Sequence, residues 1–306
     1  MSEQINVIGL SGGKDSTALF GWAIHESGYP RDSIYPAFCD TENEYQEVYD
    51  QIDALDLYGQ ARGVRPIARL RATGAWATAK TPLFLALALW KGRFPSARAR
   101  FCTDHLKIRP TKKFIEELQK AGDLVTHSGV RASESIERST MTEFSRDIFD
   151  CPHRRPLLAW TINDIWLAHK RWGLPINRLY FDGWKRVGCR LCVMSSKADV
   201  RRTVQKRPSV IDLYRDWEQR LGRSRAARGS VSAYSSWFSR RTVPLPQRSL
   251  RVDTKSGPMM VPTIDDVARW STTSRGGVQQ CADFMFAESD FNIDDVHHPC
   301  QAGFCE

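Results

Sequence analysis

The chain has 306 residues, of which 42% are hydrophobic and 26% are charged, so it can form one large domain or two smaller ones. Its longest apolar run, at 83–90, is far shorter than the roughly 20 residues that cross a bilayer, and we expect a buried helix and no membrane contact there. The first residues lack the basic and apolar regions of a secretion signal, which favours a cytoplasmic protein.

Apolar runs that predict strands recur along the first half of the chain, with helical patterns between most of them. The expected strands are 5–10, 34–40, 64–70, 123–131 and 155–160. The expected helices are 15–27, 42–59, 83–90, 108–122 and 161–173, the last with Thr161 as its cap, Asp164 at the third helical position and Gly173 as its end. This alternation is typical of a Rossmann-like α/β fold, a parallel sheet with crossover helices.

The composition changes after about residue 185, where strand patterns fade and basic residues gather. We therefore predict a nucleotide-binding α/β domain at 1–185 and a smaller, basic, mainly helical or irregular C-terminal region at 186–306. The net charge of +9 and the arginines of 201–228 favour contact with a polyanion such as nucleic acid. An anionic nucleotide substrate would account for part of the same excess.

The segment Ser11–Ser16, with the sequence SGGKDS, lies between the first expected strand and the first expected helix. Gly12 and Gly13 allow close approach of a ligand to the backbone, and the N–H groups at a helix N-terminus attract anions. Lys14 adds a mobile positive charge. The pattern predicts a pyrophosphate-binding loop and matches neither G-x-x-x-x-G-K-[ST] nor G-x-G-x-x-G.

Ser-Gly-Gly-x-Asp-Ser after a first strand resembles the PP-loop of the ATP-pyrophosphatases, the adenine nucleotide alpha-hydrolase-like group. Later segments are similar, in the same order, to motifs of the phosphoadenylylsulfate (PAPS) reductases within that group. These segments are FCDTENEYQEVYDQI at 38–52, GVRASESIERS at 129–139, PLLAWTINDIW at 156–166 and GLPINRLYFDGWKRVGC at 173–189. The resemblance covers roughly residues 5 to 200.

The resemblance implies that the loop grips the β and γ phosphates of ATP while an acceptor attacks the α-phosphorus. It implies catalytic roles for Lys14, Asp15 and Cys102. The nucleotide-binding residues would be Ser11, Gly12, Gly13, Lys14, Asp15, Ser16, Asp40, Gly129 and Arg131. Glu134, Arg138 and Lys107 would contact substrate or phosphate, with Arg109 beside Lys107 open to the same interpretation. Asp15 or Asp40 would hold Mg²⁺. For Arg131 and Arg138 the alternative to a phosphate contact is a salt bridge with Glu134 or Glu137.

Eight cysteines in a cytoplasmic chain indicate metal or redox chemistry in place of disulfides. Cys189 and Cys192 form a C-x-x-C pair, whose spacing suits either one metal ion or a redox disulfide. In the iron–sulfur sulfonucleotide reductases, which this chain resembles, an earlier Cys-Cys pair joins the C-x-x-C pair in binding the cluster. This chain has Cys102 at the first position of that earlier pair and Thr103 at the second.

We predict a [4Fe-4S] cluster, or Zn²⁺, held by Cys102, Cys189 and Cys192 with Cys300 or Cys305 as a further ligand. Cys281 is a weaker candidate, and His297 and His298 allow a mixed zinc site. Cys39 and Cys151 are expected to be structural.

Two departures from the PAPS reductases favour ATP as the substrate. Those enzymes usually lack the double glycine and lysine of the loop, and they end in Glu-Cys-Gly, whereas this chain keeps SGGKDS and ends in GFCE. The pattern most resembles the ATP-pyrophosphatase component of DNA phosphorothioation systems. We therefore expect an ATP-pyrophosphatase that adenylylates an acceptor for sulfur transfer, with nucleic acid and a sulfur-donor protein as partners. The alternatives are a sulfonucleotide reductase, a sulfate adenylyltransferase-like enzyme and a noncatalytic nucleotide sensor that binds nucleic acid.

Overall fold

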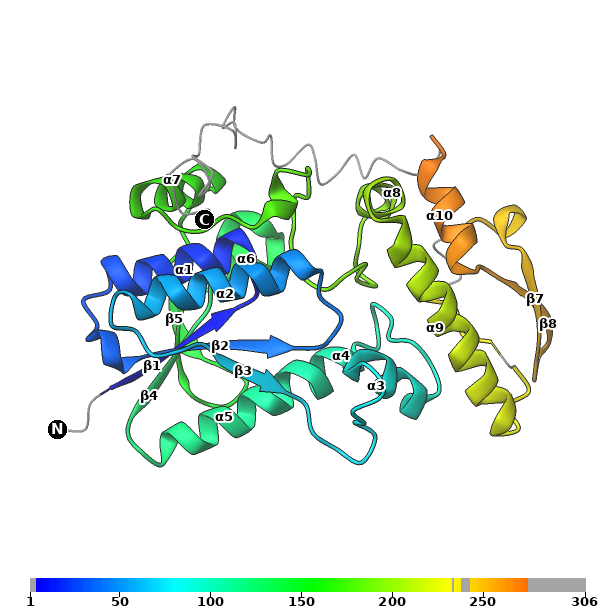
Figure 1. The fold of residues 1–306 in the computed structure, drawn as a ribbon, viewed down its shortest axis with the longest axis horizontal. Helices are drawn as coiled ribbons and strands as arrows, with labels where there is room; N and C mark the ends of the chain where they lie inside the picture. Colours follow the sequence, from blue (N-terminus) through cyan, green and yellow to red (C-terminus); the bar gives the residue numbers. More distant parts are fainter. Residues whose placement is uncertain (1–3, 233, 238–242, 275–306) are drawn as a thin grey trace.

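The computed structural model describes residues 4–232, 234–237 and 243–274, and its centre is a six-stranded sheet in the order β3-β2-β1-β4-β6-β5 (Figure 1). The strands are β1 (Ile5–Leu10), β2 (Ile34–Asp40), β3 (Ala68–Arg71), β4 (Leu124–His127), β5 (Phe144–Arg146) and β6 (Pro152–Arg154). Neighbouring strands are parallel except for the β5–β6 pair at one edge. The sheet extends from β1 to β2 and β3 on one side and to β4 on the other. The carboxyl ends of β1 and β4 therefore flank the point where the strand order reverses, which is where open α/β sheets bind ligands.

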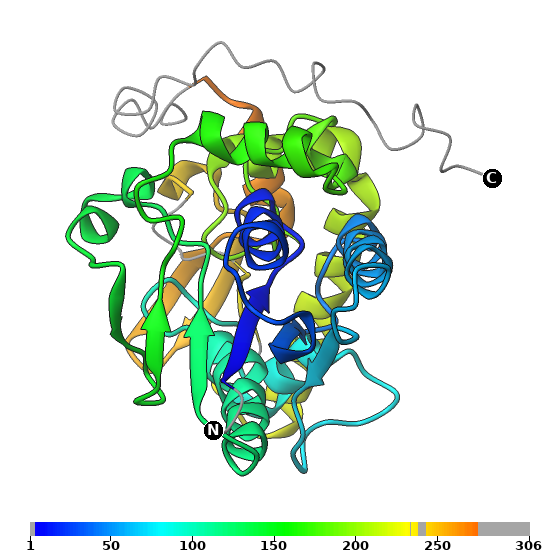
Figure 2. The ribbon, with the colours of Figure 1, turned by 90° about the vertical axis from the view of Figure 1, so that its left-hand side faces the viewer.

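Helices cover both faces of this sheet, as the Rossmann-like prediction requires (Figures 1 and 2). On one side lie α1 (Lys14–His25), α2 (Gln46–Gln60) and α7 (Ile162–Trp172), and on the other lies α5 (Arg109–Gln119). Shorter elements complete this part of the chain: α3 (Leu83–Lys91), α4 (Phe101–Thr103), the π-helical turn η2 (Asp104–Ile108), α6 (Ile136–Ser139) and the 3₁₀ turns η1 (Arg31–Ser33), η3 (Ala132–Glu134) and η4 (Arg178–Tyr180). No helix in the described ranges is long and apolar enough to cross a membrane.

The C-terminal region contains the helices α8 (Lys197–Lys206), α9 (Pro208–Ala227) and α10 (Ile264–Thr272). It lies on the side toward which the β2 and β3 arrows point in Figure 1. A 3₁₀ turn, η5 (Leu245–Gln247), and an antiparallel hairpin of β7 (Leu250–Thr254) and β8 (Gly257–Val261) complete it. The expectation of a mainly helical C-terminal region is confirmed, but the sequence patterns did not indicate this hairpin, whose two strands are short and partly exposed.

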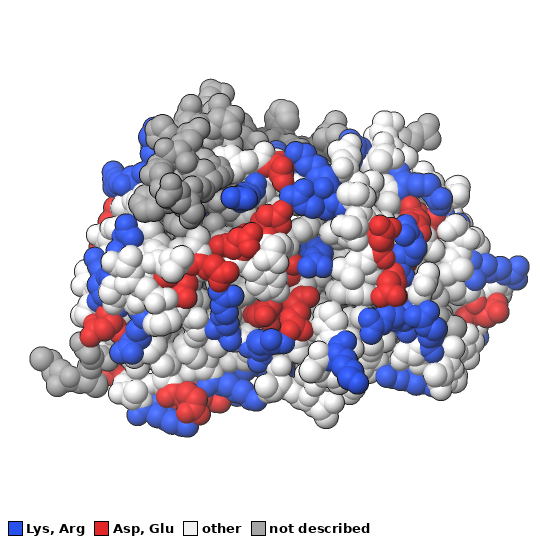
Figure 3. Space-filling view, viewed as in Figure 1, with Lys and Arg blue, Asp and Glu red and all other residues white. Residues whose placement is uncertain are grey.

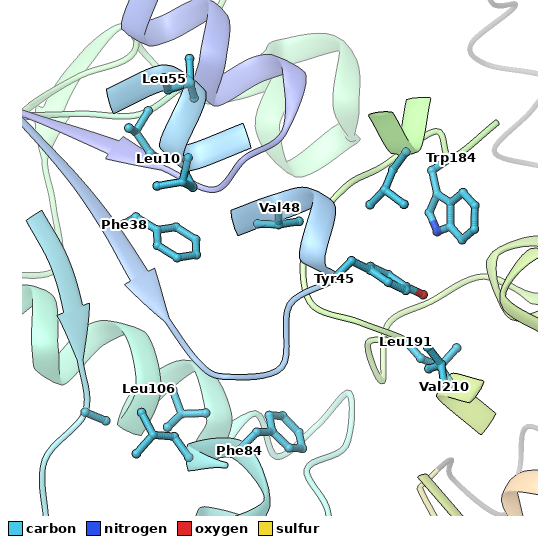
Figure 4. Close-up of a cluster of buried hydrophobic side chains, with 14 of the residues drawn as sticks. Leu10, Phe38, Tyr45, Val48, Leu55, Phe84, Leu106, Trp184, Leu191 and Val210 are labelled. Carbon is cyan, nitrogen blue, oxygen red and sulfur yellow. The ribbon is translucent and has the colours of Figure 1, made fainter. Parts of the chain in front are cut away.

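The main hydrophobic core continues from the sheet into the C-terminal region. Figure 4 shows Phe38 of β2 and Tyr45 before α2 in one cluster with Leu191 and Val210. Trp237 is 1% exposed, and its indole Nε1–H donates to the Leu191 carbonyl over 3.1 Å. Side-chain packing therefore fixes the segment that contains the C-x-x-C pair against the α/β part.

The predicted strand at 155–160 was wrong. The strand there is β6, and it ends at Arg154. The following residues form turns, in which the N–H groups of Leu158 and Trp160 donate to the carbonyls of Arg155 and Leu157. The strand does not continue because these turns lead directly into α7, which begins at Ile162. The predicted ends of that helix are confirmed, since Thr161 and Asp164 form a capping box and Gly173 is left-handed at φ 60°.

Gly129 follows β4 where the chain passes closest to the first turn of α1. A Cβ atom at this position would lie 2.7 Å from the Asp15 carbonyl oxygen, a backbone atom that has little freedom to move. Only glycine fits this contact without displacing α1 or the β4 end.

We predict that Gly129→Ala lowers the free energy of unfolding by about 1–3 kcal/mol, because the added methyl group overpacks this contact. Urea denaturation of the variant and the wild type measures the difference. Gly188→Ala is the matched control, since a Cβ at Gly188 meets no atom of the described residues within 4 Å. Equal stability of Gly129→Ala and the wild type would contradict the close approach.

Candidate functional site

The loop between β1 and α1 is built by Ser11, Gly12 and Gly13. Ser16 closes it, because its hydroxyl accepts from the Ser11 N–H over 3.1 Å and donates to the Gly13 carbonyl over 3.0 Å. Gly12 has φ +72°, and a Cβ there would lie 2.9 Å from Cγ1 of Val48 on α2. The two glycines thus allow a tight turn that directs the N-terminus of α1 to the carboxyl edge of the sheet.

Two buried side chains hold the Lys14 peptide groups. The Lys14 N–H donates to the Tyr180 hydroxyl oxygen over 2.8 Å, and the imidazole Nε2–H of His169 donates to the Lys14 carbonyl over 2.9 Å. Burial lowers the pKa of His169 to about 4, so the ring is neutral and carries its proton on Nε2. The Lys14 ammonium donates to Asp15 over 3.0 Å. The sequence prediction singled out neither residue. Tyr180 lies in the segment 173–189, which is similar to a family motif, whereas His169 lies between two such segments.

Asp15 joins the loop to the end of β4. Its carboxylate accepts from Lys14 Nζ and, over 2.7 Å, from Nε of Arg131, whose side chain is 8% exposed. Burial alone would raise the pKa of Asp15, but the charges of Lys14 and Arg131 outweigh that effect and hold it below its ordinary value. The sequence alternative for Arg131 was a bridge with Glu134 or Glu137; its side chain instead contacts Asp15 and the Ser133 hydroxyl.

Arg138 and Glu134 form an ion pair with each other, as the alternative interpretation of these residues expected. Glu134 also accepts from the Arg131 N–H over 3.1 Å. The three residues predicted to contact nucleotide or phosphate, Arg131, Glu134 and Arg138, therefore lie side by side on the segment after β4. Gly129 leads directly into that segment.

The end of β2 presents acidic side chains beside the loop. Asp40 accepts from the Glu42 N–H and from the Tyr49 hydroxyl, each over 2.9 Å. Glu44, which the sequence prediction did not single out, is 3% exposed and accepts from the Thr41 hydroxyl over 2.7 Å. Burial raises the pKa of Glu44. Within the described residues Asp40 has no cationic side chain as a partner, so it retains capacity to bind a cation.

The C-x-x-C segment lies against the loop that contains Glu44. A single antiparallel bridge pairs Glu44 with Cys189, and the Cys189 thiol donates to the Glu44 carboxylate over 3.8 Å. The Arg190 N–H donates to the Asn43 carbonyl over 2.6 Å. Contacts between segments about 145 residues apart in the chain thus place the cysteine pair beside the β2 end.

Three of the predicted ligands, Cys102, Cys189 and Cys192, interact electrostatically with Lys107. Burial raises the pKa of Cys189 to about 12, and charges on Cys192 and Cys102 add to the effect. The negative charge of Cys189 is the largest cause that raises the pKa of Lys107, and the charges of Glu44 and Cys39 raise it further. Burial of the Lys107 amine acts in the opposite direction. Cys39 contacts the Thr111 hydroxyl at 3.3 Å, and Cys151 is buried, positions that suit the structural roles expected of both.

Thiolates suit iron and zinc, but the described residues contain no group of three or more Cys, His, Asp or Glu side chains placed to hold a metal ion. The remaining predicted ligands lie outside the described residues: Cys281, His297, His298, Cys300 and Cys305. The cysteine neighbourhood therefore supplies part of a ligand set.

Many arginines of the basic stretch 201–228 have partners within the protein. Arg207 pairs with Glu47 and Asp182, Arg215 pairs with Asp265, and Arg225 donates to the Gly92 carbonyl. Figure 3 shows Lys and Arg interspersed with Asp and Glu on the face in view. Much of the basic charge thus joins the C-terminal helices to one another and to the α/β part.

Comparisons with known proteins place these features in a wider context. A family model described as the phosphoadenosine phosphosulfate reductase domain matches residues 5–195. The chain is 30% identical to an uncharacterised 37.8 kDa protein of Escherichia phage 186, over 99% of this chain and 97% of that protein. It is 28% identical to the adenosine 5'-phosphosulfate reductase of Oceanobacillus iheyensis, over 54% of this chain and 63% of that enzyme. A solved phosphoadenylyl-sulfate reductase from Candida auris, in a phosphate complex, aligns with a TM-score of 0.44 and 15% identity over 62% of this chain and 82% of that one.

We predict that Arg131→Met lowers the free energy of unfolding at pH 7 by about 3 kcal/mol, because it leaves the Asp15 carboxylate, which is only 20% exposed, without one of its two cations. The folded-state pKa of Asp15 is depressed, so the stability from this pair is present above the unfolded pKa of about 3.9 and is lost as pH falls through the folded value. Urea denaturation from pH 7 down to about pH 2 measures the penalty, which should stay constant above about pH 4 and shrink below it.

Arg138→Met is the matched control, since its pair with Glu134 is more exposed and we expect a smaller loss. A penalty for Arg131→Met that is the same at every pH would contradict the role of the Asp15 charge.

Proposed function

The chain belongs to the phosphoadenosine phosphosulfate reductase domain family, and on that premise we propose that it is an ATP-pyrophosphatase that adenylylates an acceptor for sulfur transfer. The observation that carries this proposal is the complete loop from Ser11 to Ser16, whose Lys14 peptide groups are held in place by Tyr180 and His169. A substrate without β and γ phosphates would have no use for such a loop.

The proposed reaction transfers the adenylyl group of ATP. An acceptor atom attacks the α-phosphorus, the bond from that phosphorus to the bridging oxygen breaks, and pyrophosphate leaves with the electron pair. The loop N–H groups and the Lys14 ammonium stabilise the charge that develops on the leaving pyrophosphate. The rate enhancement would come mainly from positioning and charge stabilisation, since no side chain has to form a covalent bond to ATP.

We assign the Mg²⁺ that accompanies ATP to Asp40 in preference to Asp15. The Asp15 carboxylate already contacts two cations, Lys14 and Arg131, whereas among the described residues Asp40 accepts only from an N–H group and a hydroxyl. A carboxylate at the end of β2 suits an ion that takes one or two protein oxygens and the phosphates.

We also propose that Cys102, Cys189 and Cys192, with Cys300 or Cys305, bind a [4Fe-4S] cluster or Zn²⁺. Support comes from the electrostatic coupling of the three thiols beside Lys107. When bound, the metal would supply a thiolate-coordinated centre next to the acceptor. Lys107 would balance the negative charge that deprotonated thiols bring into this neighbourhood.

The acceptor and the sulfur donor belong to the same proposal. Nucleic acid is the acceptor class that the basic composition of 201–228 favours, and the donor would be a partner protein. Arginines of this stretch that already hold the C-terminal helices together, such as Arg215, would contribute less to such contact than exposed Arg223.

A sulfonucleotide reductase is the second candidate, and the similarity to the Oceanobacillus iheyensis enzyme favours it. In that reaction a cysteine attacks the sulfur of a sulfonucleotide, and a thiol reductant completes the reduction. The two candidates differ in their substrates, because only the first consumes ATP and releases AMP and pyrophosphate.

We predict that Lys14→Ala lowers ATP-dependent pyrophosphate release about 100-fold or more, because it removes the cation next to the leaving group. An enzyme-coupled pyrophosphate assay, with and without nucleic acid, measures the rate. Lys112→Ala on α5 is the control, since this lysine is exposed and pairs with Glu116 on the same helix. The loop assignment fails if both variants release pyrophosphate at the wild-type rate.

For the metal, we predict that anaerobically purified protein contains iron or zinc and that Cys189→Ala loses most of it, because C-x-x-C chelation needs both thiolates. Elemental analysis gives the metal content per chain. Cys151→Ala, which removes a buried cysteine packed against α5, should retain the wild-type content. Wild-type protein without either metal would exclude the proposed site.

A further inference from the structure

A chain of four polar side chains runs across β4 and β6, outside the proposed ATP chemistry. Ser128 Oγ lies 2.9 Å from Nε2 of His153, and Nδ1 of the same ring lies 2.7 Å from the Thr126 hydroxyl. That hydroxyl lies 2.6 Å from the Asp147 carboxylate. Thr126 pairs directly with His153 in the parallel ladder, so the sheet itself sets this alignment.

The direction of each hydrogen bond follows from the Asp147 end. One carboxylate oxygen accepts from the N–H groups of Phe149 and Cys151, and the other accepts the Thr126 proton. The alternative acceptor for Thr126, the Pro152 carbonyl, is more distant at 3.4 Å. The Thr126 oxygen therefore accepts from Nδ1–H of His153.

This tautomer leaves the lone pair on Nε2 of His153 facing Ser128. Burial lowers the pKa of His153, and the positive charge of Arg155 lowers it further, so the ring is neutral near pH 7. A neutral ring with its proton on Nδ1 can only accept at Nε2, so the Ser128 hydroxyl donates its proton there. A serine hydroxyl that donates to an imidazole oriented through a carboxylate is the arrangement that activates serine as a nucleophile.

The location suggests what this serine would attack. Ser128 precedes Gly129, which packs against the Asp15 backbone at the first turn of α1. It therefore lies at the same carboxyl edge as the pyrophosphate loop. The Arg155 guanidinium donates to the hydroxyl of Ser145, which lies opposite His153 in the β5–β6 ladder, and its positive charge suits an anionic phosphorus centre.

We propose that Ser128 is an activated nucleophile for electrophilic phosphorus, with His153 as its base and with Thr126 and Asp147 as positioning residues. Ser128 Oγ forms a bond to phosphorus, the bond to the leaving group breaks, and the leaving group departs with its electron pair. The Ser128 proton moves to Nε2 of His153. This activity does not depend on the ATP reaction proposed above, because it needs no nucleotide.

Diisopropyl fluorophosphate tests this directly on the full chain, since attack on its phosphorus expels fluoride and leaves a stable serine ester. We expect peptide mass spectrometry to map the modification to Ser128 in the wild type. Ser145 is the internal control, because it is an exposed serine opposite His153 on β5 whose hydroxyl donates to the Arg146 carbonyl and accepts from Arg155, and within the described residues it has no hydrogen bond with an imidazole. An unmodified Ser128, or modification of Ser145 at an equal rate, would overturn the proposal.

Variants then separate activation from mere accessibility. His153→Gln should slow the labelling of Ser128 about 100-fold or more, because general-base assistance contributes at least that factor. Thr126→Val should slow it as well, and Thr126→Ser should restore it by returning the bridging hydroxyl. Labelling of Ser128 at the wild-type rate in folded His153→Gln protein would overturn the role of the imidazole.

Discussion

The candidate site depends on one constraint, the position of the Lys14 peptide groups at the start of α1. Tyr180 and His169 bind the N–H and the carbonyl of this residue, and both are buried. An unmet hydrogen bond at either side chain would cost about 1–3 kcal/mol in this environment. The loop geometry is therefore fixed by residues that follow it by more than 150 positions, before any ligand binds.

The same constraint links the site to the rest of the fold. His169 belongs to α7, which packs against α1, and Tyr180 belongs to the η4 turn that follows. Beyond η4 the chain continues to the C-x-x-C pair, which a bridge to Glu44 and a bond to Asn43 hold beside the β2 end. A nucleotide at the loop and a metal at the cysteines would thus be neighbours on one edge of the sheet.

Sequence patterns were most informative where local chemistry decides the structure. The loop at 11–16, the strand–helix alternation and both ends of α7 could be predicted because glycine geometry, apolar periodicity and capping act within a few residues. The strand expected at 155–160 failed because the turn into α7 outweighed its apolar residues. The contacts of Lys14 with Tyr180 and of Arg131 with Asp15 join distant segments, so only the folded chain reveals them.

The central claim is that ATP is cleaved between its α and β phosphates, and ATP labelled with ³²P at the γ position tests it most directly. In the presence of Mg²⁺ and nucleic acid, the account predicts that the label appears in pyrophosphate while AMP or an adenylylated acceptor forms. Label in orthophosphate would contradict it, because that product requires cleavage between the β and γ phosphates. Unchanged ATP, together with reduction of a sulfonucleotide by the same sample, would contradict it equally.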